Sequence, residues 1–98
     1  MRTLNKLIIE WAKDKGILRY GTTFSQWKKT EEEVCELHNA IITDDKEEII
    51  DALGDIYVTI LIQAEMQGVK LEDCIASAYN VISKRTGKMV NGTFVKDK

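Results

Sequence analysis

The sequence predicts an all-α protein, a four-helix bundle followed by a short extended C-terminal tail. The chain contains no proline, so long helices meet no obligatory break. Apolar residues recur at three- and four-residue spacings along four segments, and residues 86–98 lose this pattern. A chain of 98 residues without a linker or an internal repeat is expected to form one domain, residues 1–98.

The first two predicted helices are separated by an irregular segment. Residues 4–11 form the first helix, because their apolar side chains share one face. Residues 17–23 are predicted to be irregular. The second helix covers residues 24–42, with Thr23 as its N-cap and Gln26 completing a capping box. Its predicted core positions are Trp27, Val34, Leu37 and Ile41.

The third predicted helix begins at a capping box that starts at Asp44 or at Asp45, and it continues to about residue 67. The fourth covers roughly residues 72–85. Asn91-Gly92, placed between two short apolar stretches, is a hairpin-turn signal in the tail. The residues of the fourth helix region that are predicted to face inward are Leu71, Ile75, Ala78, Tyr79 and Ile82.

Composition excludes several classes of function. A net charge of −2 gives no electrostatic basis for binding nucleic acid. Two cysteines far apart and one histidine cannot supply a Cys/His zinc site, and free thiols in a reducing cytoplasm are expected. No apolar run approaches the roughly 20 residues that span a bilayer, and no signal peptide is visible. A cytoplasmic protein without a membrane partner is therefore expected.

Two acidic clusters lie between Lys29 and Asp55, one on each of two consecutive helices. At about 100° per residue, one line of the second helix lies beside its apolar stripe, so carboxylates on this line point toward a groove. Glu32 falls further round the helix. The line consists of Gln26, Lys29, Glu33, Glu36 and Ala40.

On the third helix, Glu48, Asp51 and Asp55 share one face of about 60°. The second half of this helix is apolar nearly all round, so partners should enclose it. Carboxylates gathered where a buried surface opens repel each other, and Mg²⁺ or Mn²⁺, which prefer hard oxygen ligands, would relieve that repulsion. The alternative is that both clusters are solvated faces or complement helix N-termini.

The motif Gln26-x-x-Lys29-x-x-Glu32-Glu33-x-x-Glu36-Leu37, followed by Gly54-Asp55, resembles the MazG-like all-α nucleoside triphosphate pyrophosphohydrolases. The resemblance is strongest to the small single-domain members of phages and prophages, and residues 80–96 look like their tail. The family's second motif is ExxD, but Ala52 stands where the glutamate is expected. Asp51 could supply the missing carboxylate, or Glu48-x-x-Asp51 could be the working motif with Asp55 assisting.

The resemblance implies an enzyme that cleaves an NTP or dNTP between the α and β phosphates, with Mg²⁺ or Mn²⁺ as cofactor. Glu33, Glu36 and Asp55 are the leading metal ligands, followed by Asp51 and Glu48. A carboxylate not occupied by metal, Glu32 or Glu48, would orient or deprotonate water. The implied catalytic set is Glu32, Glu33, Glu36 and Glu48.

The residues implied to bind substrate have simpler explanations beside the functional one. Lys29 could pair with Glu33 four residues on, and cations at the end of a helix are favoured by its dipole. The implied substrate-binding residues are Gln26, Lys29, Asn80, Lys84 and Arg85.

Three functions remain open on the sequence. One is a nucleotide pyrophosphohydrolase that works as a homodimer or homotetramer. The second, motivated by Ala52, is a catalytically weak nucleotide- or metal-binding helical oligomerisation module. The third is a structural helical adaptor whose acidic residues are only solvated. An oligomer is expected because the third helix is too apolar for one small bundle to enclose.

Overall fold

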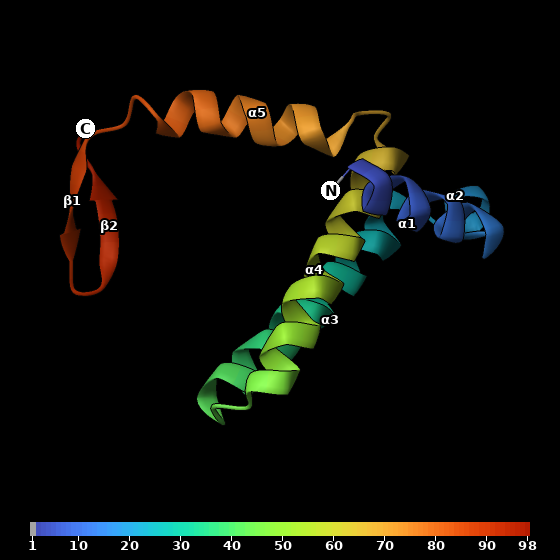
Figure 1. Ribbon diagram of the computed structural model, residues 1–98, viewed down its shortest axis with the longest axis horizontal. Helices are drawn as coiled ribbons and strands as arrows, with labels where there is room; N and C mark the ends of the chain where they lie inside the picture. Colours follow the sequence, from blue (N-terminus) through green and yellow to red (C-terminus); the bar gives the residue numbers. More distant parts are fainter. Residues whose placement is uncertain (1) are drawn as a thin grey trace.

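Five helices and one β-hairpin make up residues 2–98, the part of the chain that the computed structural model describes (Figure 1). The predicted all-α class with a short extended tail is confirmed. No helix within residues 2–98 is both long and apolar enough to cross a membrane. The elements are α1 (Arg2–Asp14), α2 (Ile17–Tyr20), α3 (Thr23–Ile42), α4 (Lys46–Met66), α5 (Leu71–Ile82), β1 (Gly87–Val90) and β2 (Thr93–Lys96).

The antiparallel pair α3 and α4, here called the stem, is the main packing unit of the chain (Figure 1). Asp45 begins α4, and its side chain accepts a hydrogen bond from the backbone N–H of Glu48 at 3.3 Å, which confirms one of the two predicted caps. Gln26 Nε2 donates to the carbonyl oxygen of Thr59 at 3.1 Å, across the two helices. Buried small and polar residues of the two helices, among them Ala40, Ala52 and Thr59, accompany this bond.

Two details of the predicted boundaries are wrong. Thr22, not Thr23, caps α3, because the Thr22 hydroxyl accepts the backbone N–H of Ser25 at 3.1 Å. The segment predicted to be irregular contains α2, a single helical turn closed by the backbone hydrogen bonds Tyr20 N–H to Gly16 O and Gly21 N–H to Ile17 O. The Thr22 cap shifts the start of α3 by one residue, and local backbone hydrogen bonds form the helical turn α2.

Most of the predicted core positions of α3 are exposed within one chain. The side chains of Trp27, Val34 and Ile41 are about half exposed, at 51%, 49% and 58%. The physical reason is that α3 has only α4 as a packing partner among the described elements. That contact buries Gln26 and Ala40 and leaves the apolar stripe of α3 without a cover.

The apolar core is small and lies where α1 crosses the end of α4. Leu61, Ala64 and Leu71 form its buried centre, and Ile8, Ile9 and Tyr57 pack around them. The Tyr57 hydroxyl and Asn5 Oδ1 are 2.8 Å apart, so the hydroxyl donates to the buried amide oxygen. Helix α1 is thereby fixed to the same end of the stem from which α5 departs (Figure 1).

Residues 71–98, here called the arm, lead away from the stem (Figure 1). Among the described elements α5 contacts only α4, and the hairpin strands contact only each other. The radius of gyration is 15.9 Å, against about 13 Å for a compact domain of this length. The predicted turn is confirmed, with Asn91 at φ 50° and Gly92 at φ 82°. The inward-facing prediction fails within one chain for Ile75, Tyr79 and Ile82, because no element covers α5.

Candidate metal centre

Three carboxylates from the two helices of the stem converge on one point. Glu33 and Glu36 stand one turn apart on α3, and Asp55 reaches them from α4. One oxygen of each lies within 4.8 Å of the other two, and within residues 2–98 this is the one such group of acidic, histidine or cysteine side chains. We call Glu33, Glu36 and Asp55 the carboxylate cluster.

Glu33 is the most constrained member of the carboxylate cluster. It is half-buried, and its Oε2 atom is inaccessible to solvent and has no hydrogen-bond partner. Burial raises the pKa of Glu33 above 4.5, the adjacent Glu36 and Asp55 carboxylates raise it further, and Lys29 opposes the shift. An unpaired buried carboxylate oxygen is costly. The site therefore favours a proton or a cation at this position.

The donor set fits a divalent cation of the hard class. All three converging atoms are carboxylate oxygens, and Glu36 and Asp55 are open to solvent. Mg²⁺ and Mn²⁺ favour such oxygens, and Mg²⁺ commonly keeps several waters beside its protein ligands. The orphaned Glu33 oxygen is the observation that separates this cluster from an ordinary solvated acidic face.

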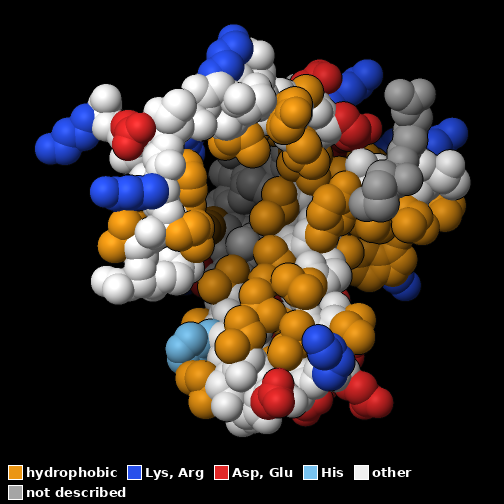
Figure 2. Space-filling view, turned by 60° about the vertical axis from the view of Figure 1, so that its left-hand side comes forward, with side chains coloured by type: hydrophobic (Ala, Val, Ile, Leu, Met, Phe, Trp, Pro, Cys, Tyr) orange, Lys and Arg blue, Asp and Glu red, His pale blue; other side chains and the backbone are white. Residues whose placement is uncertain are grey.

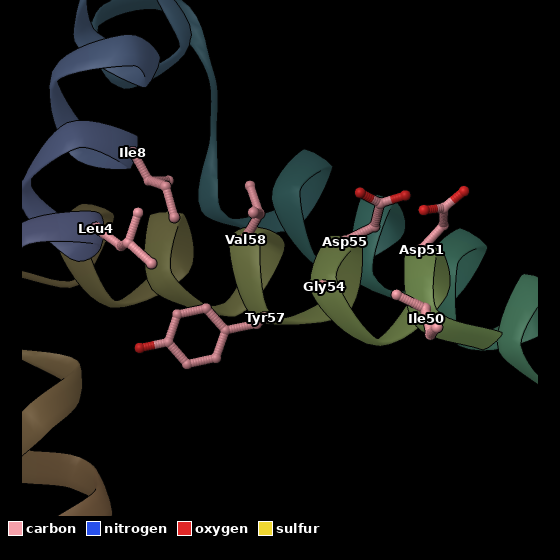
Figure 3. Close-up of a pocket in the computed structure, with 8 residues that line it drawn as sticks. All are labelled: Leu4, Ile8, Ile50, Asp51, Gly54, Asp55, Tyr57 and Val58. Carbon is pink, nitrogen blue, oxygen red and sulfur yellow. The ribbon is translucent and has the colours of Figure 1, made fainter. Parts of the chain in front are cut away.

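Asp51 lies on the same face of α4 as Asp55, one turn nearer the N-terminus of that helix. Figure 3 shows both carboxylates pointing to the same side of α4. Asp51 is exposed and is not a member of the three-oxygen cluster, so it lies beside the cluster rather than in it. Glu48 occupies the first turn of α4 and is also exposed and outside the cluster.

The remaining predicted residues of α3 already have partners in the stem. Lys29 Nζ lies 3.2 Å from Glu32 Oε2, so Lys29 pairs with Glu32, three residues on, rather than with Glu33. Gln26 is buried and its amide nitrogen is bonded to α4. The structure thus places Glu32 outside the carboxylate cluster and buries Gln26 in the contact between α3 and α4.

The predicted substrate-binding residues of the C-terminal region are not brought to the carboxylates within one chain. Asn80 lies on α5, and Lys84 and Arg85 follow it before β1. All three are exposed and belong to the arm, which contacts the stem only through α4.

Ala52, which departs from the expected motif, is only 3% exposed. It lies one turn before Asp55, on the side of α4 that carries Thr59 and faces α3. The cluster forms around Asp55 without any carboxylate at position 52. A glutamate at this position would have to enter the helix interface beside Glu33 and Glu36.

Sequence reasoning missed an apolar hollow next to the carboxylates. It has a volume of about 690 Å³ and lies over Gly54, where an added Cβ would meet no atom within 4 Å. Leu4 and Ile8 of α1 form one wall, and Asp51 and Asp55 form another (Figure 3). The apolar periodicity of α1 was the available signal, but it predicted a buried helix face rather than the wall of a hollow.

An all-α fold whose helical hairpin brings a Glu-x-x-Glu pair and an aspartate together defines the class: the MazG-like all-α pyrophosphohydrolase superfamily. The chain belongs to the phosphoribosyl-ATP pyrophosphohydrolase family, whose model matches residues 1–80. The β-hairpin lies beyond the matched residues. No curated protein and no solved structure matches the chain.

Proposed function

We propose that the protein is a metal-dependent nucleoside triphosphate pyrophosphohydrolase, which converts an NTP or dNTP to a monophosphate and pyrophosphate. The observation that carries the proposal is the convergence of Glu33, Glu36 and Asp55 around a buried oxygen without a partner. Membership of a pyrophosphohydrolase family supports the reaction class. We place the activity in the cytoplasm, in a homodimer or homotetramer.

Glu33, Glu36 and Asp55 would hold Mg²⁺, with Mn²⁺ as a substitute. Asp51, whose carboxylate points to the same side of α4 as that of Asp55, is the next candidate ligand. The metal, when bound, would offset phosphate charge and lower the pKa of a water molecule. Glu48 and Glu32 are the proposed acceptors of the proton that the attacking water loses. Glu48 shares the helical face of Asp51 and Asp55, whereas Glu32 pairs with Lys29.

The hollow beside the carboxylates supports a nucleotide as the substrate. Its volume of about 690 Å³ falls within the roughly 300–1,000 Å³ of small-molecule sites. Leu4, Ile8 and Val58 offer an apolar surface to a base or sugar, while the acidic wall lies on the side where metal-bound phosphates would sit. An apolar surface with a few polar groups at one end is typical of ligand pockets.

The proposal is tested by a substrate screen. Purified protein with Mg²⁺ is incubated with each common and modified NTP and dNTP, and pyrophosphate release is measured. Glu36→Gln serves as the inactive control, because it removes a ligand but keeps the side chain's shape. The expected result is metal-dependent pyrophosphate release by the wild type and its loss in the variant. No turnover with any triphosphate would overturn the proposal.

Two alternatives are each favoured by one observation. The family match favours phosphoribosyl-ATP as substrate, so this compound belongs in the same screen. The buried Ala52 favours a module that binds nucleotide or metal without hydrolysis. The second alternative predicts that Mg²⁺ plus nucleotide raises the melting temperature while no pyrophosphate appears. A melting temperature unchanged by Mg²⁺ and nucleotide would favour a purely structural role.

A further inference from the structure

A chain of hydrogen bonds crosses the stem one turn from the carboxylate cluster. The Thr30 hydroxyl of α3 donates to the Thr59 hydroxyl of α4 at 3.0 Å, and the Thr59 hydroxyl donates to the carbonyl oxygen of Ile56 at 2.8 Å. The Gln26 amide donates to the carbonyl oxygen of Thr59 at 3.1 Å. Gln26 and Thr59 are buried and Thr30 is half-buried. We call Gln26, Thr30 and Thr59 the polar network.

The polar network adjoins both halves of the carboxylate cluster. Thr30 precedes Glu33 by three residues on α3, and Thr59 follows Asp55 by four on α4. Each threonine therefore lies one turn from a cluster carboxylate on its own helix. The carbonyl oxygen that ends the chain belongs to Ile56, the neighbour of Asp55. The bond between the two threonines thus fixes the distance between α3 and α4 close to the level where Glu33 meets Asp55.

Both hydroxyl groups of the polar network direct their single hydrogen away from Glu33. Thr59 donates to Ile56, and Thr30 has the Thr59 hydroxyl and, at 3.3 Å, the Gln26 carbonyl oxygen as acceptors. Glu33 Oε2 is buried and has no donor. A hydroxyl turned toward this oxygen would satisfy it in place of an ion. The polar network therefore joins the helices without occupying the oxygen that a cation would bind.

Apolar packing within one chain does not set this spacing by itself. Trp27 and Val34 of α3 are about half exposed, and Figure 2 shows hydrophobic side chains gathered over the middle of the molecule. Apolar burial has no preferred direction, whereas a hydrogen bond requires a definite distance and angle. Repulsion among the carboxylates favours separation of the two helices. The polar network is the directional contact that opposes this separation.

We propose that Thr30 and Thr59 are positioning residues that hold the carboxylate cluster at a spacing suited to a small divalent cation, and that they thereby favour Mg²⁺ over Ca²⁺. Mg²⁺ binds oxygens at about 2.0–2.1 Å in near-ideal octahedral geometry, whereas Ca²⁺ accepts about 2.3–2.6 Å and variable geometry. A fixed helix spacing suits the smaller ion, and a looser stem suits the larger one. This inference rests on the metal binding of the proposed function.

The test measures metal affinity rather than activity. Full-length, metal-free proteins are titrated with Mn²⁺, whose free ion is followed by electron paramagnetic resonance, and Mg²⁺ or Ca²⁺ is then added as a competitor. Thr59→Val removes the shared hydroxyl and nearly keeps the side chain's shape, and Thr59→Ser restores the hydroxyl. Thr43→Val is the matched control, because it removes a hydroxyl that bonds the carbonyl oxygen of Asn39 at 3.0 Å, within α3 and its cap.

Thr59→Val should lose about tenfold in affinity for Mg²⁺ and a smaller factor in affinity for Ca²⁺. The ratio of the two affinities therefore falls, whereas Thr59→Ser and Thr43→Val should keep the wild-type ratio. A general loss of stability would lower both affinities by the same factor. The ratio thus separates positioning from a merely structural role.

A folded Thr59→Val that keeps the wild-type ratio would overturn the inference and leave the proposed function intact. Thr30→Val breaks the same bond from the other helix, and it decides the question by the same criterion if Thr59→Val does not fold. A wild type that binds none of the three ions would overturn the proposed function and, with it, this inference.

Discussion

Replacing Glu33 with glutamine removes one negative charge from the carboxylate cluster and preserves the shape of the side chain. Two unit charges within 4.8 Å of each other repel by about 1 kcal/mol in a medium as polar as water. Glu33 has two such neighbours, and partial protonation and salt reduce the sum. The metal-free variant should therefore be about 1 kcal/mol more stable than the wild type, which raises its melting temperature by roughly 4–8 °C.

Bound metal should make the wild type more stable than Glu33→Gln. A divalent ion at tenfold its dissociation constant stabilises the wild type by about 1.4 kcal/mol, and the variant, which lacks one ligand, gains less. The assay is thermal denaturation at one protein concentration, in EDTA and then across a Mg²⁺ or Mn²⁺ series. Glu32→Gln is the matched control, because Glu32 is on the same helix but outside the cluster. The reasoning is refuted if Glu33→Gln destabilises the protein in EDTA or keeps the full metal-dependent rise.

Three further predictions concern the stem. The pKa of Glu33 in the folded state is raised above its ordinary value of 4.5. The free energy of unfolding of the metal-free protein should therefore fall as the pH rises above 4.5, and Glu33→Gln should no longer be more stable than the wild type below that pH. Urea denaturation from about pH 4 to 8 measures this. Ala52→Glu should lower the free energy of unfolding in EDTA by about 3 kcal/mol or more, because it adds a buried charge. Mg²⁺ should restore part of this loss of stability. A loss that Mg²⁺ does not change would contradict the expected position of the new carboxylate beside the carboxylate cluster. Gln26→Ala should cost about 1–3 kcal/mol through its buried bond to Thr59, whereas Gln67→Ala, exposed, should change stability by less than about 0.5 kcal/mol in urea.

The local features of the fold were predictable because they depend on short-range chemistry. Periodicity placed α1, α3 and α4, the Asp45 cap starts α4, and Asn91-Gly92 forms the hairpin turn. Helix geometry predicted that the acidic faces of α3 and α4 meet, and the family resemblance named Glu33, Glu36 and Asp55 as the leading ligands among them. These are statements about neighbours along one helix or across one turn.

The packing partners of each helix were not predictable in the same way. Periodicity shows that Trp27 and Val34 lie on the apolar face of α3 and Tyr79 on that of α5, but it does not say which surface covers each face. In one chain the small residues of the stem pack together and these large side chains stay exposed. A choice among carboxylates also needed coordinates, because Glu48 and Asp51 share the helical face of Asp55 and differ only in height along α4.

The most direct measurement for the central claim is a crystal structure with Mn²⁺ and a non-hydrolysable triphosphate, in which anomalous scattering locates the ion. The account predicts Mn²⁺ bound by oxygens of Glu33, Glu36 and Asp55 at distances of about 2.1 Å, with phosphate oxygens completing its coordination. An ion bound elsewhere, with these three side chains hydrated and apart at saturating Mn²⁺, would contradict it.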